Sequence, residues 1–150
     1  MTTTHPTRRT TAHVLAAAAV LSTPMAATAG PGGLGVSTDL ADARSATATF
    51  HRTAAASAAG YGPFPEGVPL HECISAPIPG HGAMGVHWLD ASLLDTTLDP
   101  AAPEVLVYEP TKHGRLRLVG MEYVVFAGAW EAAHPGTTPQ IFGADMTYVP

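Results

Sequence analysis

The sequence predicts an α+β fold, with one N-terminal amphipathic helix packed on a small antiparallel sheet of three to four strands. Two patterns carry this prediction. Apolar residues recur at three- and four-residue steps between residues 39 and 59, which is typical of one face of a helix. Later runs rich in Val, Leu and Tyr are separated by turns that contain Pro and Gly, which is typical of antiparallel strands.

The helix is expected over residues 39–59. Thr38 or Asp39 is placed to cap its N-terminus, and Gly60 follows where a left-handed residue ends many helices. The stripe that should face the sheet consists of Leu40, Ala43, Thr47, Phe50, Ala54 and Ala58. If the runs 104–109 and 115–126 pair as an antiparallel hairpin, Phe50 of this helix should pack on the apolar side of the longer strand.

The strands are expected over residues 84–90, 104–109 and 115–126, and a short fourth strand is expected within residues 141–150. Pro110 and Gly114 bound the loop between the second and third runs, which favours a hairpin. Residues 61–83 are rich in Pro and Gly and are expected to form a loop.

The first 29 residues are typical of a cleavable export signal. Arg8 and Arg9 give a positive start, residues 14–21 form a short apolar core, and Ala27 and Ala29 form a small-x-small cleavage site. Residues 30–37 are then a flexible leader, and residues 38–150 a single domain. We therefore expect a secreted or extracytoplasmic protein, with Sec and twin-arginine export both open.

Charge and cysteine content limit the partners. Removal of residues 1–29 takes away two of the seven Lys and Arg residues and none of the 12 acidic residues, so the formal charge falls from −5 to −7. An acidic protein is a poor partner for nucleic acid, and nothing after residue 29 is long and apolar enough to span a bilayer. Cys73 is the only cysteine, which in an exported protein suggests an intermolecular disulfide, a metal ligand or a disulfide partner missing from this chain. The alternative is that Cys73 is simply a small, buried apolar residue.

A metal site for copper or zinc is one hypothesis, with His87, Glu122 and His81 as ligands. Strict alternation places Glu122 in line with Leu116 and Leu118, on the face expected to meet the helix. If the strands of His87 and Glu122 are neighbours and both side chains point inward, a His–carboxylate pair results. A bulge at Gly120 would instead move Glu122 to the outer face.

Enzymatic activity has little support. The sequence lacks a G-x-S-x-G nucleophile elbow, and its two G-x-G-x-x-G stretches lack the strand–turn–helix context of a dinucleotide site. The leading hypothesis is therefore a non-catalytic binding or structural protein of the cell exterior. The alternative is a metal-binding protein or metal-dependent enzyme that uses His87 and Glu122.

Several motifs resemble those of a family of small exported bacterial proteins, most of them uncharacterised. The matching segments include Cys73-Ile74-Ser75, Met84-Gly85-Val86-His87, Tyr108-Glu109-Pro110 and the run from Gly114 to Tyr123. The resemblance implies export and a further C-terminal segment that holds a closing cysteine. It therefore implies that this chain is C-terminally truncated and that Cys73 lacks its disulfide partner. It implies no activity.

Overall fold

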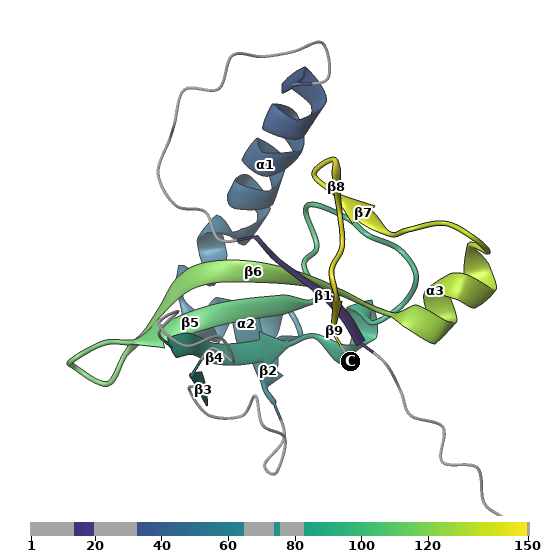
Figure 1. Ribbon diagram of the computed structural model, residues 1–150. Helices are drawn as coiled ribbons and strands as arrows, with labels where there is room; N and C mark the ends of the chain where they lie inside the picture. Colours follow the sequence, from purple (N-terminus) through teal and green to yellow (C-terminus); the bar gives the residue numbers. More distant parts are fainter. Residues whose placement is uncertain (1–13, 20–32, 65–73, 76–82, 150) are drawn as a thin grey trace, which may run out of the picture.

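The computed structural model describes residues 14–19, 33–64, 74–75 and 83–149. Within these residues the fold is α+β, with helical segments packed on an antiparallel sheet (Figure 1). The fold class predicted from the sequence is therefore confirmed at this level.

The sheet is built from four longer strands in the order β4-β5-β6-β1, and every neighbouring pair is antiparallel. These strands are β4 (Ala83–Leu89), β5 (Val105–Pro110), β6 (Leu116–Phe126) and β1 (Val14–Ala19). Three two-residue strands extend it: β2 (Gly62–Pro63) and β3 (Ile74–Ser75) pair with β4, and β9 (Tyr148–Val149) pairs with β1.

The predicted hairpin is present, since β5 pairs with β6 around the loop that begins after Pro110. Its register shifts once: Val107 lies opposite Gly120, but the next residue, Tyr108, lies opposite Leu118. Val119 is therefore an extra residue on β6. A bulge of this kind inverts the alternation of the side chains that follow it.

The helical segment differs from the expected single helix over residues 39–59. It comprises α1 (Gly33–Thr47), the 3-10 helix η1 (Ala48–His51) and α2 (Thr53–Ala58). Arg52 interrupts it with extended backbone angles, φ −99° and ψ 110°. The segment also follows β1 in the chain, so the prediction of an N-terminal helix is wrong.

The break at Arg52 changes which residues face the sheet. Ala43 and Thr47 are buried as predicted, and Phe50 packs against the core, but beyond the break Ala56 is buried in place of Ala54 and Ala58. A rotation at the break has shifted the phase of the stripe. Gly60 has φ +110°, which confirms the left-handed position at the end of the segment.

Elements at both ends of the domain differ in part from the expectation. Residues 33–37 of the predicted flexible leader belong to α1, so Thr38 and Asp39 lie inside the helix and do not cap it; residues 30–32 lie outside the described residues. A short helix, α3 (Ala127–Ala133), directly follows β6. The expected C-terminal strand is present as the hairpin β7 (Gln140–Ile141) and β8 (Ala144–Asp145), followed by β9.

Both faces of the sheet are apolar. The helical face carries the larger core, in which buried residues of the helices and of the segment after α3 meet β5 and β6. Its buried members are Ala43, Ala56, Tyr61, Leu106, Tyr108, Met121, Tyr123, Val125, Ile141 and Met146. The opposite face carries Val105, Val107 and Val124, with Phe64, Leu89 and Leu94 packed against them. Side chains on this second face are therefore also removed from water.

Candidate functional site

His87 and Glu122 meet on the face opposite the helices. The His87 Nε2 atom lies 3.3 Å from Glu122 Oε1, and the two side chains are 0% and 14% exposed. The predicted pair is therefore present, but not where alternation placed it. The bulge at Val119, directly before Gly120, moves Glu122 out of line with Leu116 and Leu118. Its position on the helical face, expected from strict alternation, is therefore wrong, and the alternative of a bulge that moves Glu122 to the other face is confirmed, one residue from the expected place.

The pair also spans β5, a strand that the sequence predicted but did not place between the other two. β5 lies between β4 and β6, so the expectation that the two strands are neighbours is wrong. His87 lies opposite Val107, and Glu122 lies opposite Val105, so the two side chains reach toward each other across β5. Gly120 has no side chain beside Val107 on this face, which leaves the space above β5 open to them.

His87 has one ring nitrogen without a partner. Its Nδ1 is buried and forms no hydrogen bond with any described residue. A neutral imidazole that donates its Nε2 proton to Glu122 leaves a lone pair on Nδ1. This arrangement, in which a carboxylate orients a histidine from behind, is the one that metal-binding histidines adopt. An apolar cluster lies nearby, and the Phe64 ring is 6.4 Å from the imidazole.

The third predicted ligand, His81, lies outside the described residues, as does Cys73. Within the part of the chain that the structure does describe, no three His, Cys, Asp or Glu side chains gather in a way that could hold a metal ion. The structure therefore brings together two of the three predicted ligands.

Glu104 is a buried acid that the sequence reasoning missed. It is 1% exposed, and its Oε2 accepts a hydrogen bond of 2.9 Å from the Val124 N–H. Burial raises the pKa of its carboxyl group to about 7, and the Val124 hydrogen bond only partly offsets this. A signal was present: Glu104 shares the alternation of Leu106 and Tyr108, the side chains of β5 that face the helices.

Two tyrosines flank Glu104 and tie the link between β4 and β5 to the core. The Tyr61 hydroxyl donates to Pro103 O and the Tyr123 hydroxyl to Pro100 O, each at 2.7 Å. Burial, reinforced by the nearby carboxylates, raises the pKa of both phenols well above the usual value. Both hydroxyl groups therefore stay protonated and hold the loop, and they are not available as acids or bases near neutral pH.

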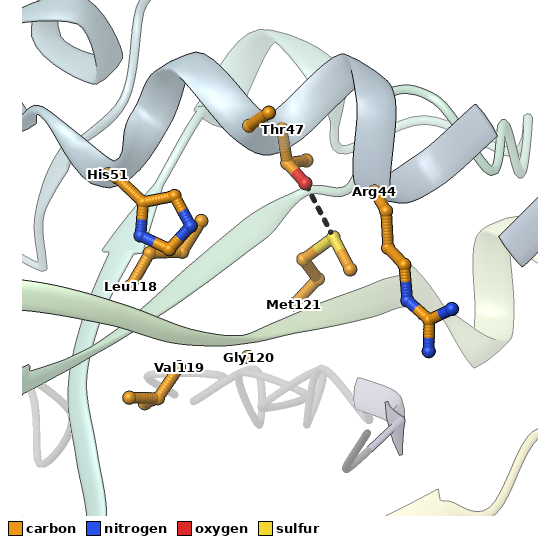
Figure 2. Close-up of a pocket in the computed structure, with 8 residues that line it drawn as sticks. Arg44, Thr47, His51, Leu118, Val119, Gly120 and Met121 are labelled. Atoms are coloured by element: carbon orange, nitrogen blue, oxygen red, sulfur yellow. Dashed lines mark hydrogen bonds between the residues drawn. The ribbon is translucent and has the colours of Figure 1, made fainter. Parts of the chain in front are cut away.

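A hollow lies between the helical segment and β6 on the helical face (Figure 2). Its empty volume is about 500 Å³. Arg44, Thr47 and His51 reach toward β6 from one wall, and Leu118 and Met121 face them from the strand. The residues that line it are Arg44, Thr47, Ala48, His51, Leu118, Val119, Gly120 and Met121.

The wall of this hollow is held by local contacts. The Thr47 hydroxyl lies 2.7 Å from Ala43 O, the acceptor one turn back, and 3.2 Å from the Met121 sulfur. Neither a backbone carbonyl oxygen nor a thioether sulfur can accept the proton as a general base, so these contacts do not activate Thr47 as a nucleophile. No carboxylate lines the hollow. Its lining therefore carries the positive charge of Arg44 and no acid.

Comparison with protein-family models, with curated proteins and with solved structures found no match to this chain. The family resemblance noted in the sequence therefore stays a prediction. Among the described residues, no helix has the length and apolar character that crossing a membrane requires.

Proposed function

We propose that this chain is an exported, non-catalytic binding protein of the cell exterior. The hollow between η1 and β6 is the observation that carries the binding role. It is open to solvent, its volume of about 500 Å³ is enough for a small ligand, and no nucleophile hydrogen-bonded to a base lines it. The order of charge, apolar core and cleavage site in residues 1–29 supports export.

The test combines compartment with binding. Protein recovered outside the cytoplasm is sequenced from its N-terminus, and then mixed with isolated cell-envelope fragments of the producing organism and sedimented. We expect a first residue near Gly30 and co-sedimentation of the protein. Ala48→Trp, which fills the hollow from an exposed position on η1, should abolish co-sedimentation.

Ala129→Trp is the matched control, because Ala129 is an exposed alanine on α3 outside the hollow. It should sediment like the unmodified chain. An intact Met1 on cytoplasmic protein would contradict export, and equal behaviour of the two tryptophan variants would contradict a binding role for the hollow.

Metal binding is a second candidate function. It is supported by the buried Nδ1 of His87, which has no hydrogen-bond partner among the described residues, and by Glu122, which contacts the other ring nitrogen. Zinc or copper measured in protein purified without an affinity tag should be stoichiometric and should fall in His87→Ala and Glu122→Gln. His113→Ala, on the exposed hairpin loop, is the control and should keep the metal. Background metal in the unmodified protein would remove this candidate.

A further inference from the structure

Positive charge is concentrated in one region of this acidic protein. Every Lys and Arg residue after residue 29 lies on the helical segment or on the hairpin that joins β5 to β6: Arg44, Arg52, Lys112, Arg115 and Arg117. All five side chains are exposed. The same elements carry four of the 12 acidic residues, Asp39, Asp42, Glu109 and Glu122, and the other eight lie on parts of the chain without Lys or Arg after residue 29. An anion would therefore meet less repulsion here than at the rest of the chain.

The hollow of Figure 2 continues into a second and larger one, with an empty volume of about 1320 Å³. The two share His51, and their walls follow one another along β6. We call the two hollows together the basic groove. The second is lined by His51, Arg52, Thr53, Ala54, Thr111, Gly114, Arg115, Leu116 and Arg117.

Three of the four arginines in the groove form no ion pair with a described residue. Arg117 forms an ion pair with Glu109 on the neighbouring strand. Arg44, Arg52 and Arg115 form no ion pair with any residue that the structure describes. These three guanidinium groups are therefore free of ion pairs with described residues, and the three arginines line both ends of the groove and not a single point.

The chemistry of the lining narrows the ligand. A guanidinium group presents its donors as a planar fork that matches phosphate, and four of the five basic residues are arginines. The groove is open along its length, which suits an extended chain. No Phe, Tyr or Trp lines either hollow, whereas proteins that bind single-stranded nucleic acid stack bases on aromatic rings.

We propose that the basic groove binds a linear phosphate polymer that carries no bases. This inference rests on the proposed binding role of the hollow and names the class of its ligand. Phosphates would lie against Arg52 and Arg115 in the larger hollow, and the chain would run past His51 toward Arg44.

The experiment titrates the full chain with inorganic polyphosphate and follows binding by calorimetry at several salt concentrations. Contact with about three phosphates predicts a slope of about −2 for log K against log salt concentration. The double variant Arg52→Gln/Arg115→Gln should weaken binding by more than tenfold. Circular dichroism should show that this variant keeps its fold, because both side chains are exposed.

The matched control is Ala129→Glu/Ala132→Glu, which lowers the net charge by the same amount on α3, at the other end of β6. It should bind almost as tightly as the unmodified chain, since local charge in the groove decides affinity. Equal weakening in both double variants would overturn the proposal, as would equal or tighter binding of single-stranded DNA or polyglutamate.

The two proposals fail separately. If polyphosphate does not bind but Ala48→Trp still abolishes envelope co-sedimentation, the binding role holds and the phosphate polymer is the wrong ligand. If polyphosphate binds and the protein is not exported, the groove is assigned correctly and the proposed compartment is wrong.

Discussion

Glu104 shows how the position of one side chain sets a property of the whole protein. It precedes the apolar run of β5, and it is enclosed with its carboxyl group bonded to the Val124 N–H. Desolvation of the charged form raises its pKa from 4.5 to about 7. Between these two pKa values the carboxyl group is therefore mostly protonated in the folded protein and mostly ionised in the unfolded chain.

Glu104 should make the protein less stable as pH rises from about 4.5 to 7. Below this window both states carry the proton; within it the unfolded state loses the proton first; above it the full cost is present, about 3 kcal/mol for a shift of this size. Glu104→Gln should remove this dependence. The difference in free energy of unfolding between the variant and the unmodified protein should therefore shift in favour of the variant between pH 4.5 and pH 8. Urea unfolding at the two pH values measures this difference.

Glu131→Gln is the control for this effect, because Glu131 is exposed on α3. Its free energy of unfolding should follow the unmodified protein at both pH values. If Glu104→Gln also runs parallel to the unmodified protein, the Glu104 carboxyl group is already ionised in the folded state near neutral pH.

At the level of secondary structure elements, the helical segment meets the sheet through Phe50. Its ring lies 5.2 Å from that of Tyr61, and its carbonyl oxygen accepts a 2.8 Å hydrogen bond from the Tyr108 hydroxyl. The ring packs against the core but remains partly exposed. The docking predicted from the sequence is confirmed, with a less complete burial of this side chain.

Phe50→Ala should cost about 2 kcal/mol, below the roughly 3–5 kcal/mol typical of a fully buried phenylalanine. Denaturant unfolding gives the value. Val119→Ala, at a side chain that is 45% exposed, should change the free energy of unfolding by less than about 0.5 kcal/mol. Equal effects of the two substitutions would show that Phe50 does not anchor the helical segment.

Gly85 lets β4 approach β5. Its φ is +99°, and a Cβ atom there would lie 2.7 Å from Val107 Cγ1 and 2.9 Å from Tyr108 O. Gly85→Ala therefore combines backbone strain with overlap and should cost about 2–4 kcal/mol. Gly114, with φ +71° and no atom near the added Cβ, isolates the strain alone.

Gly114→Ala should accordingly cost about 1 kcal/mol, and thermal unfolding ranks the two variants. The reverse order would mean that β4 can move away from β5 without loss.

The elements that the sequence predicted correctly depend on local patterns. The hairpin follows from two β-rich runs and the loop that Pro110 and Gly114 bound, so its pairing was predictable. For the face of Glu122 the sequence left two alternatives, a regular strand or a bulge at Gly120, because no local pattern decides between them; the extra residue at Val119 makes the strand bulged. Strand order was also beyond reach, since the link between β4 and β5 does not dictate which strand lies in the middle.

The same limit explains the candidate sites. The His87–Glu122 pair was predicted, yet from a wrong face and a wrong strand order, because a contact across β5 depends on register and strand order together. The basic groove was not predicted. Its arginines come from the helical segment and from the hairpin, two parts of the chain that only the tertiary fold brings together.

For the molecule as a whole, the sheet edge and the proposed export are linked. β1, Val14–Ala19, lies within the segment that we propose is cleaved, and it pairs with Met121–Phe126 of β6. Cleavage after Ala29 would remove this strand. The backbone groups of β6 that face β1 would then lose these partners, since a strand at a sheet edge presents unpaired N–H and C=O groups.

The direction of these groups follows from a side-chain contact. The Val124 N–H points to Glu104, on the β5 side of β6. Because amide directions alternate along an antiparallel strand, the N–H groups of Met121, Tyr123 and Val125 point toward β1.

These three amides should exchange slowly with solvent in the uncleaved precursor and at least tenfold faster in dilute protein that begins near Gly30. The Val124 amide should stay protected in both, since its acceptor is part of the mature chain. Hydrogen exchange followed by NMR on the two forms measures all four amides together. Unchanged protection at Tyr123 and Val125 in the cleaved form would show that another segment pairs with this edge once β1 is gone.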